Sequence, residues 1–129
     1  MSSASLQPSL EVLLAVLTAK PEKVGELQQA LEGLTQEIRK QSGCLEARLS
    51  REVPGESRFL LYLAWKDSAA LFAHLASEEF RILQGALSLL SSSAEFESLS
   101  SKSAEVLEAV RKVEGIKVVG RGPFAEFQS

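Results

Sequence analysis

The fold is decided by residues 43–80, which read GCLEARLSREVPGESRFLLYLAWKDSAALFAHLASEEF. This stretch predicts a β-hairpin followed by a helix. The hairpin turn is expected at Pro54-Gly55, because proline presets φ and glycine accepts a positive φ. Asp67 is a good N-cap for the helix. The only histidine, tryptophan and tyrosine of the chain fall in this block, so we expect any chemistry here. The expected elements are the strands Cys44–Glu52 and Arg58–Trp65 and the helix Asp67–Ala76.

The residues before this block predict a strand and a helix. The strand is expected over residues 10–18, LEVLLAVLT, and it is apolar on both faces. The helix is expected to begin at Pro21, which suits the first helical position, and to stop at Gly43. Its apolar residues are spaced by three and four, the period of an amphipathic helix: Val24, Leu27, Leu31, Leu34 and Ile38.

The residues after the block predict two more helices and two short strands. Ser77 offers an N-cap for the first of these helices. The element order is then β-α-β-β-α-β with a trailing α-β, the split βαβ, ferredoxin-like pattern of an α+β fold with an antiparallel sheet. The two strands that are apolar on both faces are expected to lie centrally. The further expected elements are the helix Glu78–Leu90, ended by Ser91–Ser93, the strand Ala94–Leu99, the helix Ala104–Glu114, ended by Gly115, and the strand Ile116–Val119.

Composition limits the classes of function. The chain has 129 residues, which predicts one domain, and a net charge of −3 without a cluster of lysine and arginine. We therefore expect no nucleic-acid partner and no membrane partner. A single cysteine rules out an intrachain disulfide and fits a reducing compartment, and with one histidine it cannot build a four-ligand Cys/His zinc site in one protomer. No signal peptide or membrane span is indicated, so a cytoplasmic protein is expected.

Three regions are expected along the chain. Residues 1–9 are serine-rich and predicted to be flexible. Residues 10–99 form the domain. Residues 100–129 form an α-β extension that packs on the same domain or on a partner subunit, where it would cover a sheet edge. A sheet whose strands are apolar on both faces needs protein packed against each face. We therefore expect a homodimer in which a second subunit packs against one of the two faces.

The sequence resembles the antibiotic biosynthesis monooxygenase (ABM) domain, a dimeric α+β barrel. The resemblance covers about residues 9–99, and its most specific part is the block W-x-D-x-x-x-L-x-x-H-L-x-S at residues 65–77. The other matching segments are AKPEK after the first strand, SGCLEARLSRE, RFLLYLAWKDSAALFAHLASEEF and LQGALSLL. Members of the family include quinol and polyketide monooxygenases, heme-degrading enzymes and an autoinducer-processing isomerase.

The resemblance carries over to individual positions only in part. Trp65 matches a pocket tryptophan of the polyketide-oxidising members, but the asparagine and tyrosine that those members use fall at Leu61 and Leu71 here. The heme-degrading branch has tryptophan at the position of His74, a ligating histidine at the position of Gln84 and an asparagine in the first strand, so the resemblance disfavours heme degradation. His74 does match the quinol-oxidising and autoinducer-processing members.

The resemblance implies a site built around His74. A histidine with an ordinary pKa of about 6.5 suits a base near neutral pH, and we expect His74 to be catalytic. The alternative for His74 is a structural helix histidine, and for Trp65 it is core packing between sheet and helix. The expected pocket residues are Trp65, Leu61, Leu63, Leu71 and Phe80.

Other polar and reactive residues have simpler interpretations. Cys44 is expected to be a buried small hydrophobe rather than a reactive thiol. Arg48 and Arg58 could bind an anionic substrate, but solvated charges are the more common outcome. Tyr62 could donate a hydrogen bond, although an ordinary sheet position is more common.

The function implied by the resemblance is a monooxygenase without a cofactor, acting on a small hydrophobic or aromatic molecule such as a quinol. The deprotonated substrate passes an electron to O₂ itself, and the protein supplies an apolar pocket and a base. Two alternatives stay open: a non-oxidative isomerase or lyase that uses the same histidine, and a non-enzymatic binding or stress-related barrel protein.

Overall fold

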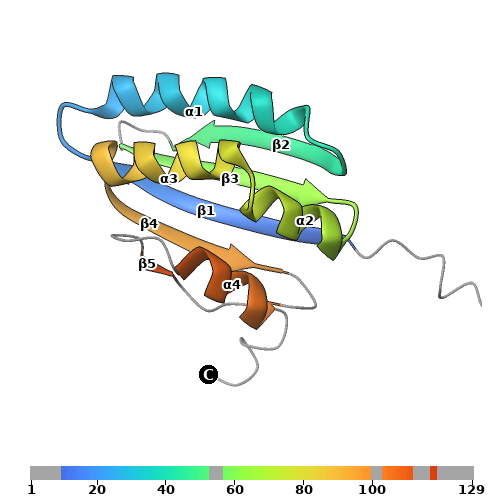
Figure 1. Ribbon diagram of the computed structural model, residues 1–129. Helices are drawn as coiled ribbons and strands as arrows, with labels where there is room; N and C mark the ends of the chain where they lie inside the picture. Colours follow the sequence, from blue (N-terminus) through green and yellow to red (C-terminus); the bar gives the residue numbers. More distant parts are fainter. Residues whose placement is uncertain (1–9, 53–56, 100–102, 112–116, 119–129) are drawn as a thin grey trace, which may run out of the picture.

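A computed structural model of the chain describes residues 10–52, 57–99, 103–111 and 117–118. The elements come in the predicted order, and the predicted ferredoxin-like α+β fold is confirmed (Figure 1). The elements are β1 Glu11–Ala19, α1 Val24–Arg39, β2 Cys44–Arg51, β3 Arg58–Trp65, α2 Ser68–Leu75, α3 Glu78–Leu90, β4 Ser91–Ser98, α4 Ser103–Arg111 and β5 Lys117–Val118.

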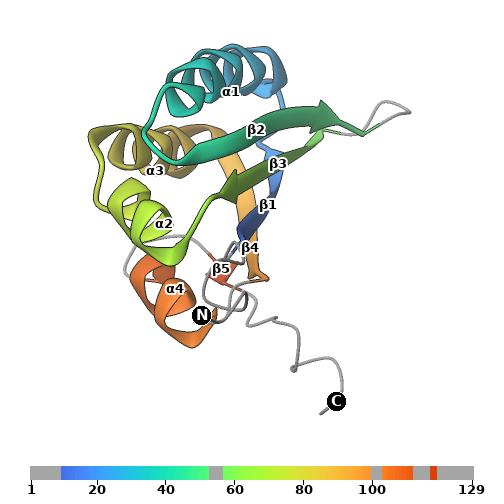
Figure 2. The ribbon, with the colours of Figure 1, turned by 90° about the vertical axis from the view of Figure 1, so that its right-hand side faces the viewer.

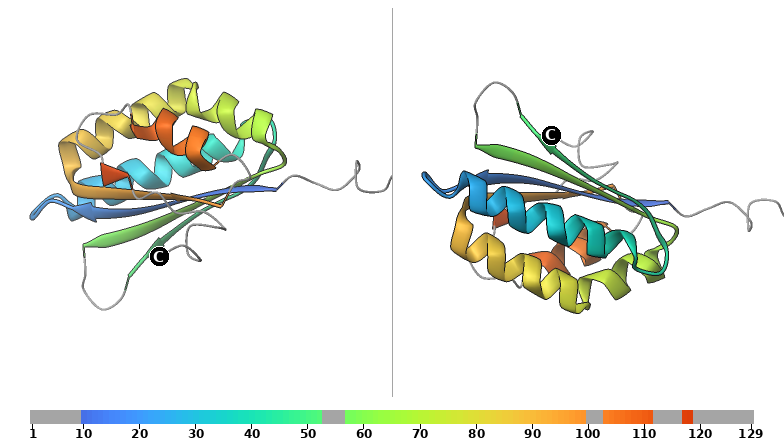
Figure 3. Two further views of the ribbon diagram at one scale, coloured as in Figure 1. Left: turned by 90° about the horizontal axis from the view of Figure 1, so that it is seen from below. Right: turned by 90° about the horizontal axis from the view of Figure 1, so that it is seen from above.

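The strands form one sheet in the order β2-β3-β1-β4-β5. β1 pairs antiparallel with both β3 and β4, β2 pairs antiparallel with β3, and the short β5 lies parallel to β4. The prediction that β1 and β3 lie centrally is therefore confirmed. The helices of the described residues, α1 to α4, lie on the same face of this sheet (Figures 2 and 3).

The two faces of the sheet differ in what covers them. Alternate residues of β1 and β3 point into the helical layer and form the core together with apolar residues of the helices. On the other face, no helix of the described part of the chain covers the sheet, as Figure 2 shows. Leu14, Val16 and Tyr62 are half-buried on that face, and Leu60 is 37% exposed.

Side chains cap the two helices that follow the hairpin, as predicted. The carboxylate of Asp67 accepts a hydrogen bond from the backbone N–H of Ala70 at 2.9 Å, which starts α2. The hydroxyl of Ser77 accepts one from the N–H of Phe80 at 3.1 Å, which starts α3. Each cap satisfies a backbone donor that a helix leaves unpaired at its N-terminus.

The helix start predicted at Pro21 is wrong, because α1 begins at Val24. Glu22 has a φ of 72°, outside the helical region, and the N–H of Lys23 closes a turn onto the carbonyl of Lys20. Pro21 therefore belongs to this turn. The helix stop predicted at Gly43 is also wrong, because α1 ends at Arg39. Gly43 lies in the following turn before β2, with a φ of 86° that glycine adopts without strain.

The serines predicted to follow α3 as a stop belong to a strand instead. β4 begins at Ser91, immediately after Leu90, and Ser91 and Ser93 lie opposite Ala19 and Thr18 of β1. Their backbone groups complete the sheet ladder, which composition alone did not reveal. The predicted turn at Pro54-Gly55 and the predicted stop at Gly115 lie outside the described residues, as do residues 1–9.

The described part of the C-terminal extension continues the fold. α4 contacts β4, β5 and α2, and it extends the helical layer over β4 (Figure 1). Val106 and Val110 are fully buried within the main core. Among the described residues, no helix has the length and apolar character needed to cross a membrane.

Candidate functional site

The predicted site residues His74, Trp65 and Phe80 meet between the sheet and the helices. The imidazole of His74 stacks on the indole of Trp65 with ring centroids 4.6 Å apart and an interplanar angle of 27°. The edge of Phe80 packs against the same imidazole at 5.2 Å, and Phe80 in turn meets Phe96 of β4 at 6.5 Å. Such offset and edge-to-face contacts are the preferred arrangements of aromatic rings.

Local sequence explains why these rings meet. Trp65 is the last residue of β3 and shares the helix-facing side of that strand with Phe59, Leu61 and Leu63. The Asp67 cap then turns the chain into α2 directly above the sheet. Leu71 and His74, three residues apart on one helical face, are the buried residues of α2. His74 is only 1% exposed, so it is not a surface histidine.

Burial determines the charge of His74. Removal from water lowers the pKa of the imidazole to about 4, and the negative charge of nearby Glu79 raises it by a smaller amount. At neutral pH the ring is therefore uncharged. The sequence-based expectation of an ordinary pKa near 6.5 does not hold in the folded protein.

Two polar side chains hold the imidazole in place. Nδ1 of His74 lies 2.7 Å from Oε1 of Gln41, and Nε2 of Gln41 donates to Oε1 of Glu79 at 2.8 Å. In contrast, Nε2 of His74 and Nε1 of Trp65 are buried and have no hydrogen-bond partner among the described residues. Since buried polar atoms usually have partners, these two nitrogens are exceptions that need an explanation.

A half-open recess adjoins the stacked rings. It has a volume of about 220 Å³ and is lined by Gln41, Ser42, Trp65, Ala70, Ala73 and His74. A cavity of about 150 Å³ is known to hold a benzene molecule, so the recess has room for a single aromatic ring. It is smaller than the roughly 300–1,000 Å³ typical of pockets for larger ligands.

The other predicted pocket residues lie beside the site but not in the recess. Leu61, Leu63 and Leu71 are at most 2% exposed and belong to the core on the side where Trp65 points. They form the apolar surroundings of the rings, and their role as substrate contacts stays a prediction.

Sequence reasoning missed four polar residues near the site. Gln41 and Glu79 gave no signal, because they lie 33 and 5 positions from His74 and meet it only through the fold. Glu11 and Ser98 are buried on the helix-facing side, Glu11 directly opposite Trp65 in the β1–β3 ladder. The sequence could have predicted their burial, since both alternate along their strands in step with apolar residues that are buried.

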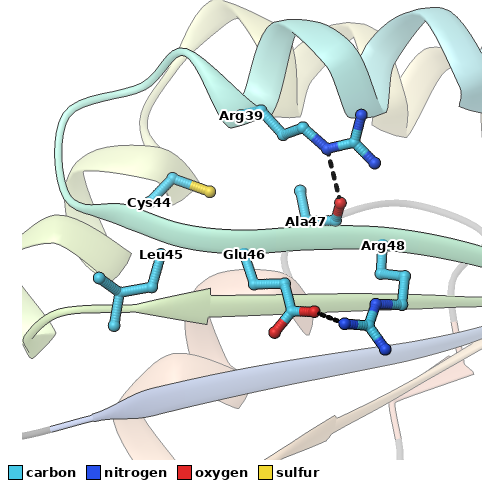
Figure 4. A pocket seen from close by; sticks show the side chains of 6 residues that line it. All are labelled: Arg39, Cys44, Leu45, Glu46, Ala47 and Arg48. Atoms are coloured by element: carbon cyan, nitrogen blue, oxygen red, sulfur yellow. Dashed lines mark hydrogen bonds and ion pairs between the residues drawn. The ribbon is translucent and has the colours of Figure 1, made fainter.

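A second recess lies along the edge strand β2, and Figure 4 shows its lining residues. Its charged side chains already have partners: Arg39 donates a hydrogen bond to the carbonyl of Ala47 at 2.9 Å, and Arg48 forms an ion pair with Glu46. Burial raises the pKa of the Cys44 thiol, which disfavours the reactive thiolate. This recess of about 440 Å³ therefore offers less chemistry than the site at His74.

The remaining polar candidates are also explained by pairing. Arg58 donates two hydrogen bonds to the carboxylate of Glu52, at 3.0 and 2.9 Å. These bonds lower the pKa of Glu52. Within the ranges that the structure describes, no three His, Cys, Asp or Glu side chains gather in a way that could hold a metal ion.

Fold and site together define a ferredoxin-like α+β protein with a buried histidine between its sheet and its helices. The sequence profile of the antibiotic biosynthesis monooxygenase family matches residues 12–85, more than half of the chain. The chain belongs to this family. The matched region contains Trp65, His74 and Phe80, whereas β4, α4 and β5 follow it.

Solved structures of similar proteins share this fold. The PA3566 protein of Pseudomonas aeruginosa is 26% identical, with a TM-score of 0.66 over 71% of this chain and 93% of its own. A conserved protein of Methanosarcina mazei is also 26% identical, with a TM-score of 0.65 over 72% and 93%. SnoaB of Streptomyces nogalater, described as a cofactor-independent oxygenase, shares the fold at 19% identity, with a TM-score of 0.63 over 73% and 94%. No protein with a curated description matches the chain significantly.

Proposed function

We propose that the chain is a cofactor-independent monooxygenase that oxidises a small phenol or quinol beside His74 and Trp65. The observation that carries this proposal is that Nε2 of His74 is buried and has no hydrogen-bond partner among the described residues. Leaving such an atom unsatisfied costs roughly 1–3 kcal/mol, and a substrate hydroxyl would remove that cost. His74 keeps the catalytic role expected from the sequence.

The chemistry needs little from the protein. A quinol that loses a proton can pass one electron to O₂, and the two radicals then combine at a ring carbon. Loss of water from the resulting hydroperoxide gives a hydroxyquinone, so that quinol plus O₂ becomes hydroxyquinone plus water. SnoaB is described as a cofactor-independent oxygenase, which supports the idea that this fold can host such a reaction.

His74 would act first as a hydrogen-bond acceptor. The uncharged imidazole can accept the substrate O–H, although a pKa of about 4 makes it a weak base in the empty site. As the substrate becomes an anion, its charge would favour the imidazolium and raise this pKa. Trp65 and Phe80 would fix the ring plane, and Leu61, Leu63 and Leu71 would keep the surroundings apolar.

We also propose that the protein works as a homodimer. Proteins of this family are typically dimers. The sheet face that carries Leu14, Val16, Leu60 and Tyr62 has no helix over it in the described part of the chain. A second copy of this face would bury these apolar side chains.

Oxygen uptake with a panel of small quinols tests the proposed activity. We expect uptake matched by hydroxyquinone formation, and a decrease of at least about a hundredfold in His74→Ala. Arg48→Ala, at the second recess, is the control and should retain full activity. Absence of uptake with every quinol would contradict the proposal. Turnover without oxygen uptake would identify an isomerase or lyase instead, and binding without turnover would identify a binding protein.

A further inference from the structure

Three side chains from three separate segments form a directed chain of hydrogen bonds that ends at His74. Glu79 lies in the first turn of α3, Gln41 in the turn between α1 and β2, and His74 on α2. The amide of Gln41 links the other two, with 2.8 Å to Glu79 and 2.7 Å to His74. The chain lies between helices rather than on the exterior, since Gln41 and Glu79 are half-buried and His74 is buried.

The backbone holds Gln41 at this position. Its N–H donates to the carbonyl of Ile38 at 3.0 Å, and its own carbonyl accepts from the N–H of Cys44 at 3.1 Å. Gln41 is thus tied to the end of α1 and to the start of β2. Its amide has few ways to move away from His74.

The chemistry of the groups fixes the direction of every bond. A carboxylate can only accept, so the NH₂ group of Gln41 must face Glu79. The amide oxygen then faces Nδ1 of His74, and because this oxygen also only accepts, Nδ1 must carry a hydrogen. A neutral imidazole has one N–H, so its Nε2 is the nitrogen with the lone pair. A reversed amide would place NH₂ against Nδ1 and favour the opposite tautomer.

We propose that Gln41 and Glu79 are positioning residues that hold His74 as the Nδ1–H tautomer, with Nε2 ready to accept a hydrogen bond from a bound hydroxyl. The role of Nε2 in binding a substrate hydroxyl rests on the proposed function, whereas the tautomer of His74 does not. Gln41 acts on the imidazole directly, and Glu79 acts through Gln41 by deciding which way its amide points.

Nuclear magnetic resonance of the full chain tests the tautomer directly. The chain has one histidine, so the imidazole nitrogens in a long-range ¹H–¹⁵N spectrum of uniformly labelled protein need no assignment among several rings. At pH 7.5 the wild type should show a hydrogen-bearing Nδ1 and an unprotonated Nε2. Gln41→Leu and Glu79→Ala should move the population toward the Nε2–H form.

Two further variants distinguish a specific effect on the His74 tautomer from a general disturbance of the structure. Glu79→Gln keeps an oxygen that can accept from Gln41 and should preserve the wild-type tautomer better than Glu79→Ala does. Gln28→Leu removes another glutamine that bonds a glutamate, Glu32 at 3.1 Å, but on the exposed side of α1. It should leave the imidazole spectrum unchanged. If Gln41→Leu fails to fold by circular dichroism, the two Glu79 variants still decide the matter.

Two results would overturn the inference: an Nε2–H histidine in the wild type, or the same Nδ1–H tautomer in Gln41→Leu and Glu79→Ala. If the wild type oxidises quinols, kcat/KM in Gln41→Leu should fall about ten- to a hundredfold, the range seen when a residue that orients a metal-ligating histidine is changed. If the wild type oxidises none, the proposed function fails, while the tautomer measurement still confirms or overturns the role of Gln41 and Glu79.

Discussion

The imidazole of His74 lies stacked on the indole of Trp65, with ring centroids 4.6 Å apart and both side chains at most 1% exposed. This contact joins the end of β3 to the buried face of α2. It also makes the charge of His74 sensitive to folding, because a stacked and buried imidazole is shielded from water in the folded protein only. The following predictions concern this contact and the elements that position it.

Lowering the pH should decrease the stability of the protein, because His74 is protonated more easily in the unfolded chain than in the folded one. Burial lowers the pKa of its imidazole from 6.5 to about 4, so between these values the unfolded chain binds a proton that the folded chain does not. The free energy of unfolding therefore falls as the pH decreases from 6.5 to 4, by about 3 kcal/mol from this group. Urea denaturation at several pH values measures it. His74→Gln should show a shallower decrease, and an unchanged slope would contradict the shift.

The cap of α2 should contribute measurable stability. Asp67→Ala leaves the N–H of Ala70 without the carboxylate at 2.9 Å, and we expect a loss of about 1 kcal/mol in the free energy of unfolding. Asp67→Asn keeps a side-chain oxygen acceptor and should lose much less. Chemical denaturation of the two variants compares them, and equal losses would show that capping is not the cause.

Two glycine-to-alanine changes should have opposite signs. At Gly43 a Cβ atom would lie 2.5 Å from the Cβ of Ala70, and the φ of 86° disfavours any side chain, so Gly43→Ala should cost about 2 kcal/mol or more. Gly33 lies within α1 with open space around it. Gly33→Ala should therefore stabilise the protein by up to about 1 kcal/mol through helix propensity. Thermal unfolding of both variants against the wild type is the measurement.

The assembly should depend on the sheet face without a helix. Leu60→Glu places a charge on that face and should give a monomer in light scattering coupled to gel filtration. Leu89 is even more exposed, at 70%, but lies on α3 in the helical layer. Leu89→Glu should therefore leave the dimer intact. A wild type that is monomeric at micromolar concentration would contradict the proposed assembly.

Much of the fold could be predicted because its signals are local. The apolar spacing from Leu27 to Ile38, the Asp67 cap and the alternation in β3 each fix an element within a few residues. The start of α1 could not be predicted, since the turn at Glu22 depends on a φ that the sequence does not reveal. The serines of β4 have no preference for strands. They join the sheet because their backbone groups pair with those of β1.

For the candidate site, the contact among the aromatic rings could be predicted from the sequence, whereas the polar partners of His74 could not. His74, Trp65 and Phe80 stand in one continuous block of sequence, so their meeting follows from the strand-to-helix connection. Gln41 and Glu79 are 38 positions apart and meet only when α1, α2 and α3 pack together. The low pKa of His74 likewise comes from tertiary burial.

The most direct test of the site is an anaerobic fluorescence titration of the single tryptophan, Trp65, with hydroquinone. Trp65 lines the recess and stacks on His74, so a ring bound there should change its emission in a saturable way. We expect saturation in the wild type, weaker binding in His74→Ala, and no effect of Arg48→Ala. An emission that changes only linearly with hydroquinone concentration would show that no ring binds beside Trp65, and the proposed site would be wrong.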